Sequence, residues 1–162
     1  MRAFVTSLAF GSLFAGTAAL ADHHENDAAI AAAMSAAPAA ISANATITTW
    51  DGTVLREGSN GWTCIPGFAE GDENPACNDA AWTHWVLTNG GGKGTEAEAN
   101  ATGVSYMLAS DPPHMMIIVP EEGGYEGLNT EPGDGEAWIM WGDKPGRHIM
   151  IPIGVNDGDD TE

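Results

Sequence analysis

The sequence predicts an α+β domain: a mainly antiparallel β-sheet of about seven strands, one packed helix and a short N-terminal helix. Short apolar and β-branched runs recur along the chain, separated by Gly, Pro, Asn and Asp turn signals, which is typical of strands. Residues 80–88 instead repeat their apolar side chains at helical spacing. Two cysteines enclose a loop between the early and the later strands.

The first 21 residues have the composition of a bacterial signal peptide. Arg2 supplies a positive start, the following residues are mostly apolar or small, and Ala19-Leu20-Ala21 matches the A-x-A cleavage pattern. A transmembrane anchor is the alternative, but the segment is short and is interrupted by polar residues and Gly. We therefore expect an exported chain, in the periplasm or beyond, without a later membrane span.

Composition divides the mature chain into three parts. Residues 22–44 are an Ala-rich helical leader, for which disorder is the alternative. Residues 45–154 have the size of a single domain stapled by the cysteines. Residues 155–162 form an acidic tail that we expect to be disordered.

The first strands are expected within residues 45–65. Asp51-Gly52 and Asn60-Gly61 are dipeptides that tight hairpin turns prefer, so they predict a three-strand antiparallel meander. Because side chains alternate along a strand, one face of this meander is predicted to carry several large residues. They are Trp50, Leu55, Trp62 and Cys64.

Asn78 or Asp79 can cap a helix over residues 80–88. We expect its Trp-bearing stripe to pack on that face of the meander. Four later strands are expected; the second is apolar on both faces, which indicates a central strand covered on both sides. They span residues 104–108, 115–119, 137–141 and 148–153.

Cys64 and Cys77 are predicted to form a disulfide, since two cysteines in an exported chain most simply form a structural cross-link. Closing a loop of this length stabilises a fold by roughly 3 kcal/mol. The alternatives are a redox pair or a zinc site. They fit poorly because the spacing is not Cys-x-x-Cys and no His stands close by.

The charge balance is strongly acidic, with 23 Asp and Glu against 5 Lys and Arg and a formal charge of −18. Such a surface repels nucleic acid and anionic membranes. The expected partner is therefore a small molecule or a protein, and composition does not specify which.

Three blocks resemble a group of uncharacterised secreted bacterial proteins with no known activity. They are Leu55-Arg-Glu-Gly-Ser-Asn-Gly-Trp-Thr-Cys64, Met115-Met-Ile-Ile-Val-Pro120 and Arg147-His-Ile-Met-Ile-Pro-Ile153. The resemblance covers most of the mature chain and implies that the blocks belong to one domain. It implies no activity and transfers no catalytic residue.

The first functional hypothesis is a non-catalytic binding or structural protein. The chain holds six Trp, and Trp side chains stack on sugars and grip apolar ligands. The alternative is that they fill the core. Trp138 and Trp141 point to opposite faces of their predicted strand, so they are the candidate ligand-binding residues.

The second hypothesis is copper or nickel binding, first at the N-terminus. Cleavage after Ala21 leaves Asp22, His23 and His24 at a free amino terminus. The amine, two amide nitrogens and the third-position imidazole then supply four nitrogens in a plane, which Cu(II) and Ni(II) prefer. One residue's shift of the cleavage site removes this site.

A separate copper site is predicted on the later strands. His114 with Met116, and His148 with Met150, each share one strand face, and imidazole with thioether suits Cu(I). The four side chains converge if the two strands are neighbours. The alternative is that the methionines fill the core and both histidines meet water at strand ends.

The third hypothesis is a hydrolase. Ser105 or Ser110 would need His114 or His148 and an acid nearby. The sequence contains no nucleophile elbow and no zinc-protease motif, so a triad would be recognised only by its geometry.

Overall fold

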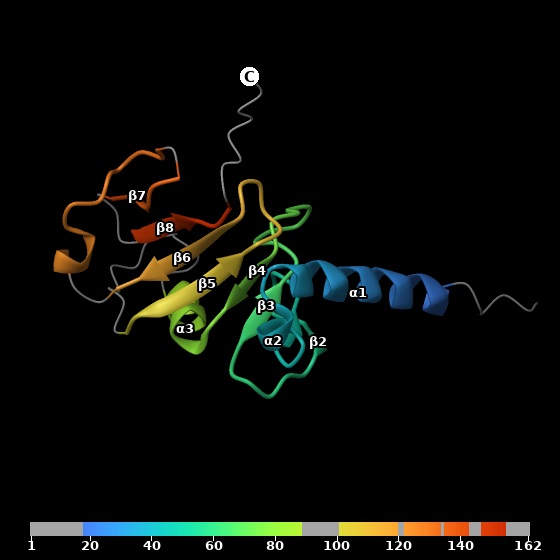
Figure 1. Ribbon diagram of the computed structural model, residues 1–162. Coiled ribbons are helices and arrows are strands. Elements are labelled where there is room, and N and C mark those ends of the chain that lie inside the picture. Colours follow the sequence, from blue (N-terminus) through green and yellow to red (C-terminus); the bar gives the residue numbers. More distant parts are fainter. Residues whose placement is uncertain (1–17, 89–100, 120–121, 134, 143–146, 155–162) are drawn as a thin grey trace, which may run out of the picture.

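The computed structural model describes residues 18–88, 101–119, 122–133, 135–142 and 147–154. Its strands form one eight-stranded sheet in the order β2-β1-β3-β4-β5-β6-β8-β7 (Figure 1). The strands are β1 Thr46–Thr48, β2 Val54–Arg56, β3 Thr63–Ile65, β4 Ala76–Asn78, β5 Gly103–Met107, β6 His114–Ile118, β7 Trp138–Met140 and β8 His148–Pro152. The helices are α1 Ala18–Ser35, α2 Ala39–Ser42 and α3 Ala80–Thr88, with a 3₁₀ helix η1 at Glu122–Tyr125.

The α+β prediction is confirmed, with eight strands in place of about seven. Strand β4, directly before α3, is the strand that the sequence reading missed. The three blocks that resemble secreted bacterial proteins all lie in this one sheet, in β2 with β3, in β6 and in β8.

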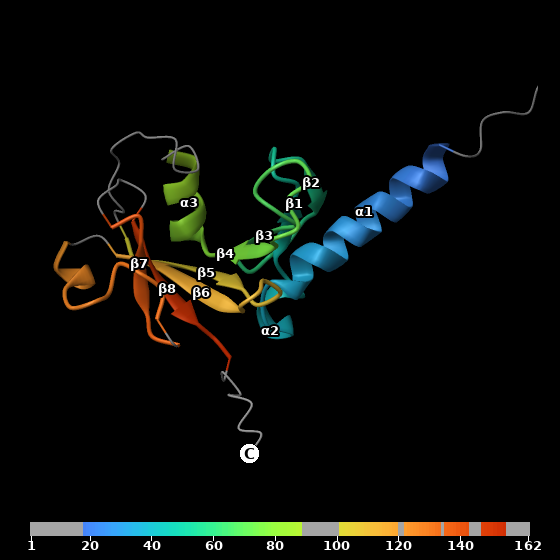
Figure 2. The same cartoon turned by 90° about the horizontal axis from the view of Figure 1, so that it is seen from above.

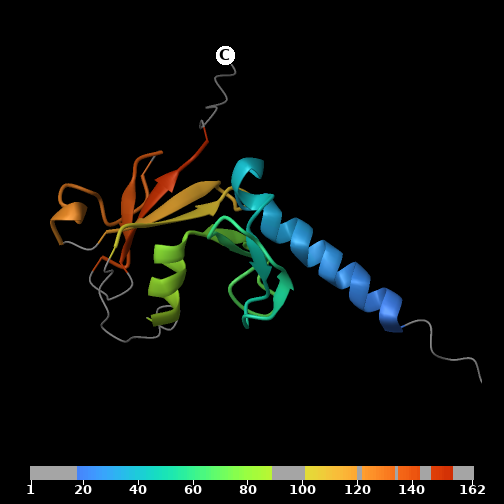
Figure 3. The same cartoon turned by 90° about the horizontal axis from the view of Figure 1, so that it is seen from below.

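The predictions for the two ends of the chain, a signal peptide and an acidic tail, are not tested by the structure. Residues 1–17 and 155–162 lie outside the described residues, so the signal peptide and the acidic tail remain predictions. Helix α1 begins before the predicted cleavage site and projects away from the sheet (Figure 3). None of the described helices is both long and apolar enough to cross a membrane.

The predicted meander is wrong in its connectivity. Strand β1 pairs with β2 in the antiparallel sense but with β3 in the parallel sense, so β1 lies between them. The second predicted turn does not form a hairpin that pairs β2 with β3, because residues 57–62 cross over the start of β1 and place β3 on its other side. A Cβ at Gly58 would overlap the backbone nitrogen of Thr46, and Asn60 Nδ2 donates to the Ile41 carbonyl at 2.8 Å.

The first predicted turn does close β1 onto β2. The Thr49 N–H donates to the Thr53 carbonyl at 2.9 Å, and the Thr53 N–H donates to Asp51 Oδ1 at 3.1 Å. The Thr49 hydroxyl also donates to Asp51, and this hydrogen bond lowers the pKa of that carboxyl. Trp50 lies in this turn and is 54% exposed, so it does not join the predicted buried face.

Asp79 caps α3 and ties the helix to the sheet. Its Oδ1 accepts the Trp82 N–H at 2.7 Å, and its Oδ2 accepts the Val104 N–H at 2.9 Å. Gly103 lets the helix approach β5 closely, since a Cβ there would lie 2.6 Å from the Trp82 nitrogen. The predicted helix bounds and one of the two predicted caps are thus confirmed.

Two cores lie on opposite faces of the sheet. Helices α1 and α2 pack over β1 to β4, in a cluster that includes the Cys64–Cys77 disulfide. Helix α3 packs on the other face (Figure 2). There Trp82 and Trp85 meet a cluster of methionines. The prediction that α3 packs beside the cysteines is therefore wrong. The cause is alternation along β4, which places Cys77 and Asn78 on opposite faces.

Candidate functional site

The α3 face of the sheet carries a group of methionines around one pair of strands. Strands β6 and β8 are antiparallel neighbours, and Met116 is the direct cross-strand partner of Met150. Directly opposite side chains share a face with Cβ atoms about 4.5–5.5 Å apart. Both methionines are 7% exposed and belong to one buried cluster. The structure therefore brings together the two predicted thioether ligands.

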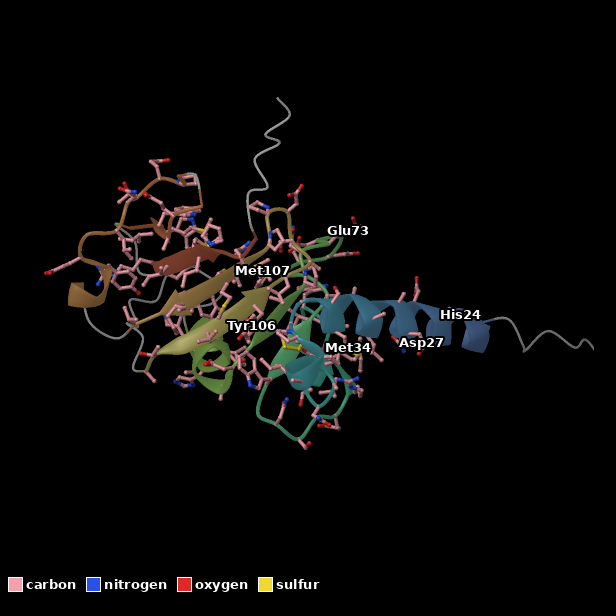
Figure 4. The ribbon with its side chains drawn as sticks, in the orientation of Figure 1. His24, Asp27, Met34, Glu73, Tyr106 and Met107 are labelled. Atoms are coloured by element: carbon pink, nitrogen blue, oxygen red, sulfur yellow. A yellow bond between two sulfur atoms is a disulfide. The ribbon has the colours of Figure 1, made fainter. Side chains whose placement is uncertain are left out.

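Met107 joins this group from the third strand. It is the cross-strand partner of His114 in the β5–β6 pair, so it lies diagonally from Met116 on the same face. Met107 is 7% exposed and belongs to the same buried cluster as Met116 and Met150. Its neighbour Tyr106 lies on the opposite face, packed against the disulfide core (Figure 4).

His114 stands at the solvent end of this group, partly exposed. Its Nδ1 lies 2.8 Å from the Pro112 carbonyl oxygen, which can only accept a hydrogen bond. Nδ1 therefore donates in this contact, so Nε2 is the ring nitrogen that a metal could bind. A backbone carbonyl on one ring nitrogen is the usual way to orient a histidine whose other nitrogen binds a metal.

His148 lies at the opposite end of the β6–β8 pair from His114. Antiparallel pairing puts Pro152, not His148, opposite His114, so the two histidines lie four residues apart along the strands. At about 3.4 Å per residue this separates them by roughly 14 Å. His148 is 4% exposed, and its ring meets those of Trp82, Trp85 and Trp141 edge to face at 5.5, 6.3 and 5.4 Å.

The two Trp proposed as ligand-binding residues differ in exposure. Trp138 is the cross-strand partner of Met150 and packs against the methionine cluster. Trp141 follows β7 in a left-handed backbone conformation with φ 57°, and it is 46% exposed. Because Trp141 lies beyond the end of β7, its side chain does not follow the alternation of the strand. Its ring packs against His148, on the face of the sheet that carries Trp138 and Met150.

The N-terminal histidines lie at the far end of α1, away from this site. His24 is exposed on the helix (Figure 4), and nothing is described of the His23 side chain. The first N–H groups of a helix have no intrahelical partner, so a helix that begins at Asp22 would offer free amides beside His24.

The serines proposed for a hydrolase are not paired with either histidine. Ser105 is fully buried, and its Oγ has no hydrogen-bond partner in the described part of the chain. The Ser110 Oγ is likewise buried without a partner. A nucleophilic serine needs a base within hydrogen-bond reach, and the described residues supply none at these two positions.

Four polar atoms are buried at and beneath α3 without a hydrogen-bond partner among the described residues. Asn78 and Ser105 are cross-strand partners, and Met116 is the next residue in the same row. Because buried polar groups are nearly always satisfied in native proteins, this row is where ordered water is expected. The four atoms are Asn78 Oδ1, Trp82 Nε1, Thr83 Oγ1 and Ser105 Oγ.

A groove of about 390 Å³ lies between α1 and the disulfide loop. The Asp72 carboxylate in its wall accepts the Phe68 N–H at 2.8 Å and the Asn74 side-chain amide at 2.7 Å. The Phe68 hydrogen bond lowers the pKa of Asp72. These hydrogen bonds stabilise the conformation of the disulfide loop, so we assign the Asp72 carboxylate a structural role and not a ligand-binding one.

We found no match to this chain among protein-family models, curated proteins or solved structures. Within the described ranges, no three His, Cys, Asp or Glu side chains gather closely enough to hold a metal ion. The metal-binding side chains that the described strands do bring together on the α3 face are thioethers. Sequence reasoning missed Met107, because the length of the β5–β6 connection alone does not give its register against His114.

Proposed function

We propose that this protein is a non-catalytic, exported protein that binds copper as Cu(I) on the methionine face of its sheet. The observation that carries the proposal is the direct pairing of Met116 with Met150 beside the His114–Met107 pair. The proposed ligands are the three thioether sulfurs and His114 Nε2. Soft thioether ligands select Cu(I) over harder divalent ions.

The setting of these residues supports the proposal in two ways. The methionines are buried, so bound Cu(I) would be shielded from water, while His114 is partly exposed and offers a route of entry. Methionine side chains have three rotatable bonds, so sulfurs from three adjacent strands can turn toward one ion. A core of Leu and Ile would fill the same volume without these donors.

The test is a competition titration of the signal-free protein with Cu(I) and a chromophoric Cu(I) chelator, without oxygen. Wild type is expected to remove one equivalent of copper from the chelator. Met116→Leu keeps the volume but removes one sulfur, so its affinity is expected to fall about tenfold or more.

Met115→Leu is the matched control, because Met115 is the next residue on β6 and lies on the opposite face of the sheet. It is expected to bind as wild type does. A wild-type protein that leaves all copper with the chelator would refute the proposal, as would equal losses in the two variants.

The N-terminal Cu(II) or Ni(II) site remains a separate prediction. His24 is exposed on a helix that projects from the body of the protein (Figure 1), so the tail can wrap an ion without disturbing the sheet. His24→Ala is expected to abolish a Cu(II) absorption band while leaving the Cu(I) competition unchanged. A Cu(II) band that persists in this variant would exclude the tail site.

A further inference from the structure

The row of side chains that contains Met116 and Met150 ends in a tryptophan at the edge of the sheet. Met150 on β8 pairs directly with Met116 on one side and with Trp138 on the other. Directly opposite side chains lie on one face with Cβ atoms about 4.5–5.5 Å apart. Trp138 packs against the buried cluster that contains both methionines. Its indole therefore lies next to the thioethers proposed as copper ligands.

Backbone contacts on both sides of β7 fix the position of Trp138. Strand β7 pairs with β8 along residues 138–140, and on its outer side the Ile139 N–H donates to the Asn129 carbonyl at 2.7 Å. Asn129 also forms a β-bridge to Trp138. The Trp138 side chain is only partly buried, and β7 is the last strand in the sheet order (Figure 1). The indole thus borders the buried methionines on the side where the sheet ends.

The elements around the methionines contain no charged residue that could neutralise a bound cation. Helix α3 and strands β5 to β8 include no Asp, Glu, Lys or Arg. Burying a cation without a compensating group costs free energy. The face of an indole ring carries negative electrostatic potential and attracts cations, and Trp does so more strongly than Tyr or Phe. Trp138 is therefore suited to offset the charge of a copper ion on this face.

We propose that the indole face of Trp138 contacts the Cu(I) ion bound by the methionines, which stabilises the ion and shields it from water. This inference rests on the proposed Cu(I) site and adds a residue to it. Trp82 and Trp141 lie on the same face, but their rings meet that of His148, at 5.5 and 5.4 Å. His148 is two residues from Met150 along β8, so Trp138 is the indole paired directly with a proposed ligand.

The first experiment is the oxygen-free Cu(I) competition titration of the signal-free protein, applied to two variants of Trp138. Trp138→Leu is expected to bind Cu(I) about tenfold more weakly than wild type, because it lacks an aromatic face. Trp138→Phe is expected to lose less, since it keeps a smaller aromatic face. Trp62→Leu is the matched control, because Trp62 is also partly buried but packs against the disulfide core on the other face. It is expected to bind Cu(I) as wild type does.

A second measurement uses the wild-type protein and so avoids any effect of substitution on folding. Each indole N–H gives its own signal in a proton–nitrogen NMR spectrum, and Cu(I) is diamagnetic. One equivalent of Cu(I) is expected to shift the Trp138 signal more than the Trp62 signal. Equal Cu(I) affinity in Trp138→Leu and Trp62→Leu, with a Trp138 signal that does not move, overturns this inference and leaves the Cu(I) site standing. A wild-type protein that leaves all copper with the chelator refutes the site and this inference together.

Discussion

Gly58 lies where two backbone segments cross without room for a side chain. A Cβ at this position would overlap the backbone of Asn44, Ala45 and Thr46, and the Gly58 N–H donates to Thr46 Oγ1 at 3.1 Å. Gly58→Ala is therefore expected to lower the free energy of unfolding by at least about 2 kcal/mol, because backbone cannot give way as a flexible side chain can.

Urea unfolding checks this expectation. Gly133→Ala is the control, since a Cβ there meets only the Glu136 side chain, at 3.8 Å or more. A Gly58→Ala protein as stable as the Gly133→Ala protein would contradict the crossing of residues 57–62 over β1.

Single residues also show how much of the candidate metal site could be predicted. The pairs His114 with Met116 and His148 with Met150 follow from alternation along each strand. Whether the two pairs meet depends on the register between β6 and β8. That register places Met116 opposite Met150 but puts the two histidines at opposite ends of the strand pair. Met107 was missed for the same reason, because its partner is fixed by the β5–β6 register.

One carboxylate, that of Asp79, accepts hydrogen bonds from both helix α3 and strand β5. Asp79 accepts the Trp82 N–H and the Val104 N–H, so Asp79→Ala leaves two backbone donors without a partner. The loss is expected to be about 1–2 kcal/mol of unfolding free energy. Thermal and urea unfolding measure it.

Asp79→Asn is the comparison, because Asn also caps helices well but offers one oxygen in place of two. Its stability is expected to lie between wild type and Asp79→Ala. An Asp79→Ala protein with wild-type stability would show that the cap is not needed to hold α3 on the sheet.

Elements with strong local signals were predicted well from the sequence. Helix α3 has a cap and a stripe of Trp at helical spacing, and the later strands have apolar alternation between clear turn signals. The order of the first strands could not be predicted, because Asn60-Gly61 has hairpin chemistry but Asn60 bonds to the Ile41 carbonyl instead. Long-range contacts override turn propensity here.

The whole molecule places its helices on opposite faces and opposite halves of one sheet. Helix α3 covers the methionine face, and α1 with α2 covers the disulfide end of the other face. The sequence predicted that β6 is covered on both sides. Helix α3 packs over Met116 and Ile118, and on the other face Gly124 of η1 lies against the Val119 side chain at the end of the strand.

X-ray absorption spectroscopy of the copper-loaded protein would show directly whether three thioethers and one imidazole bind Cu(I). We expect sulfur scattering from the methionines together with one nitrogen, and a weaker sulfur shell in Met116→Leu but not in Met115→Leu. A shell of nitrogen and oxygen alone, unchanged by Met116→Leu, would refute Cu(I) binding by the methionines.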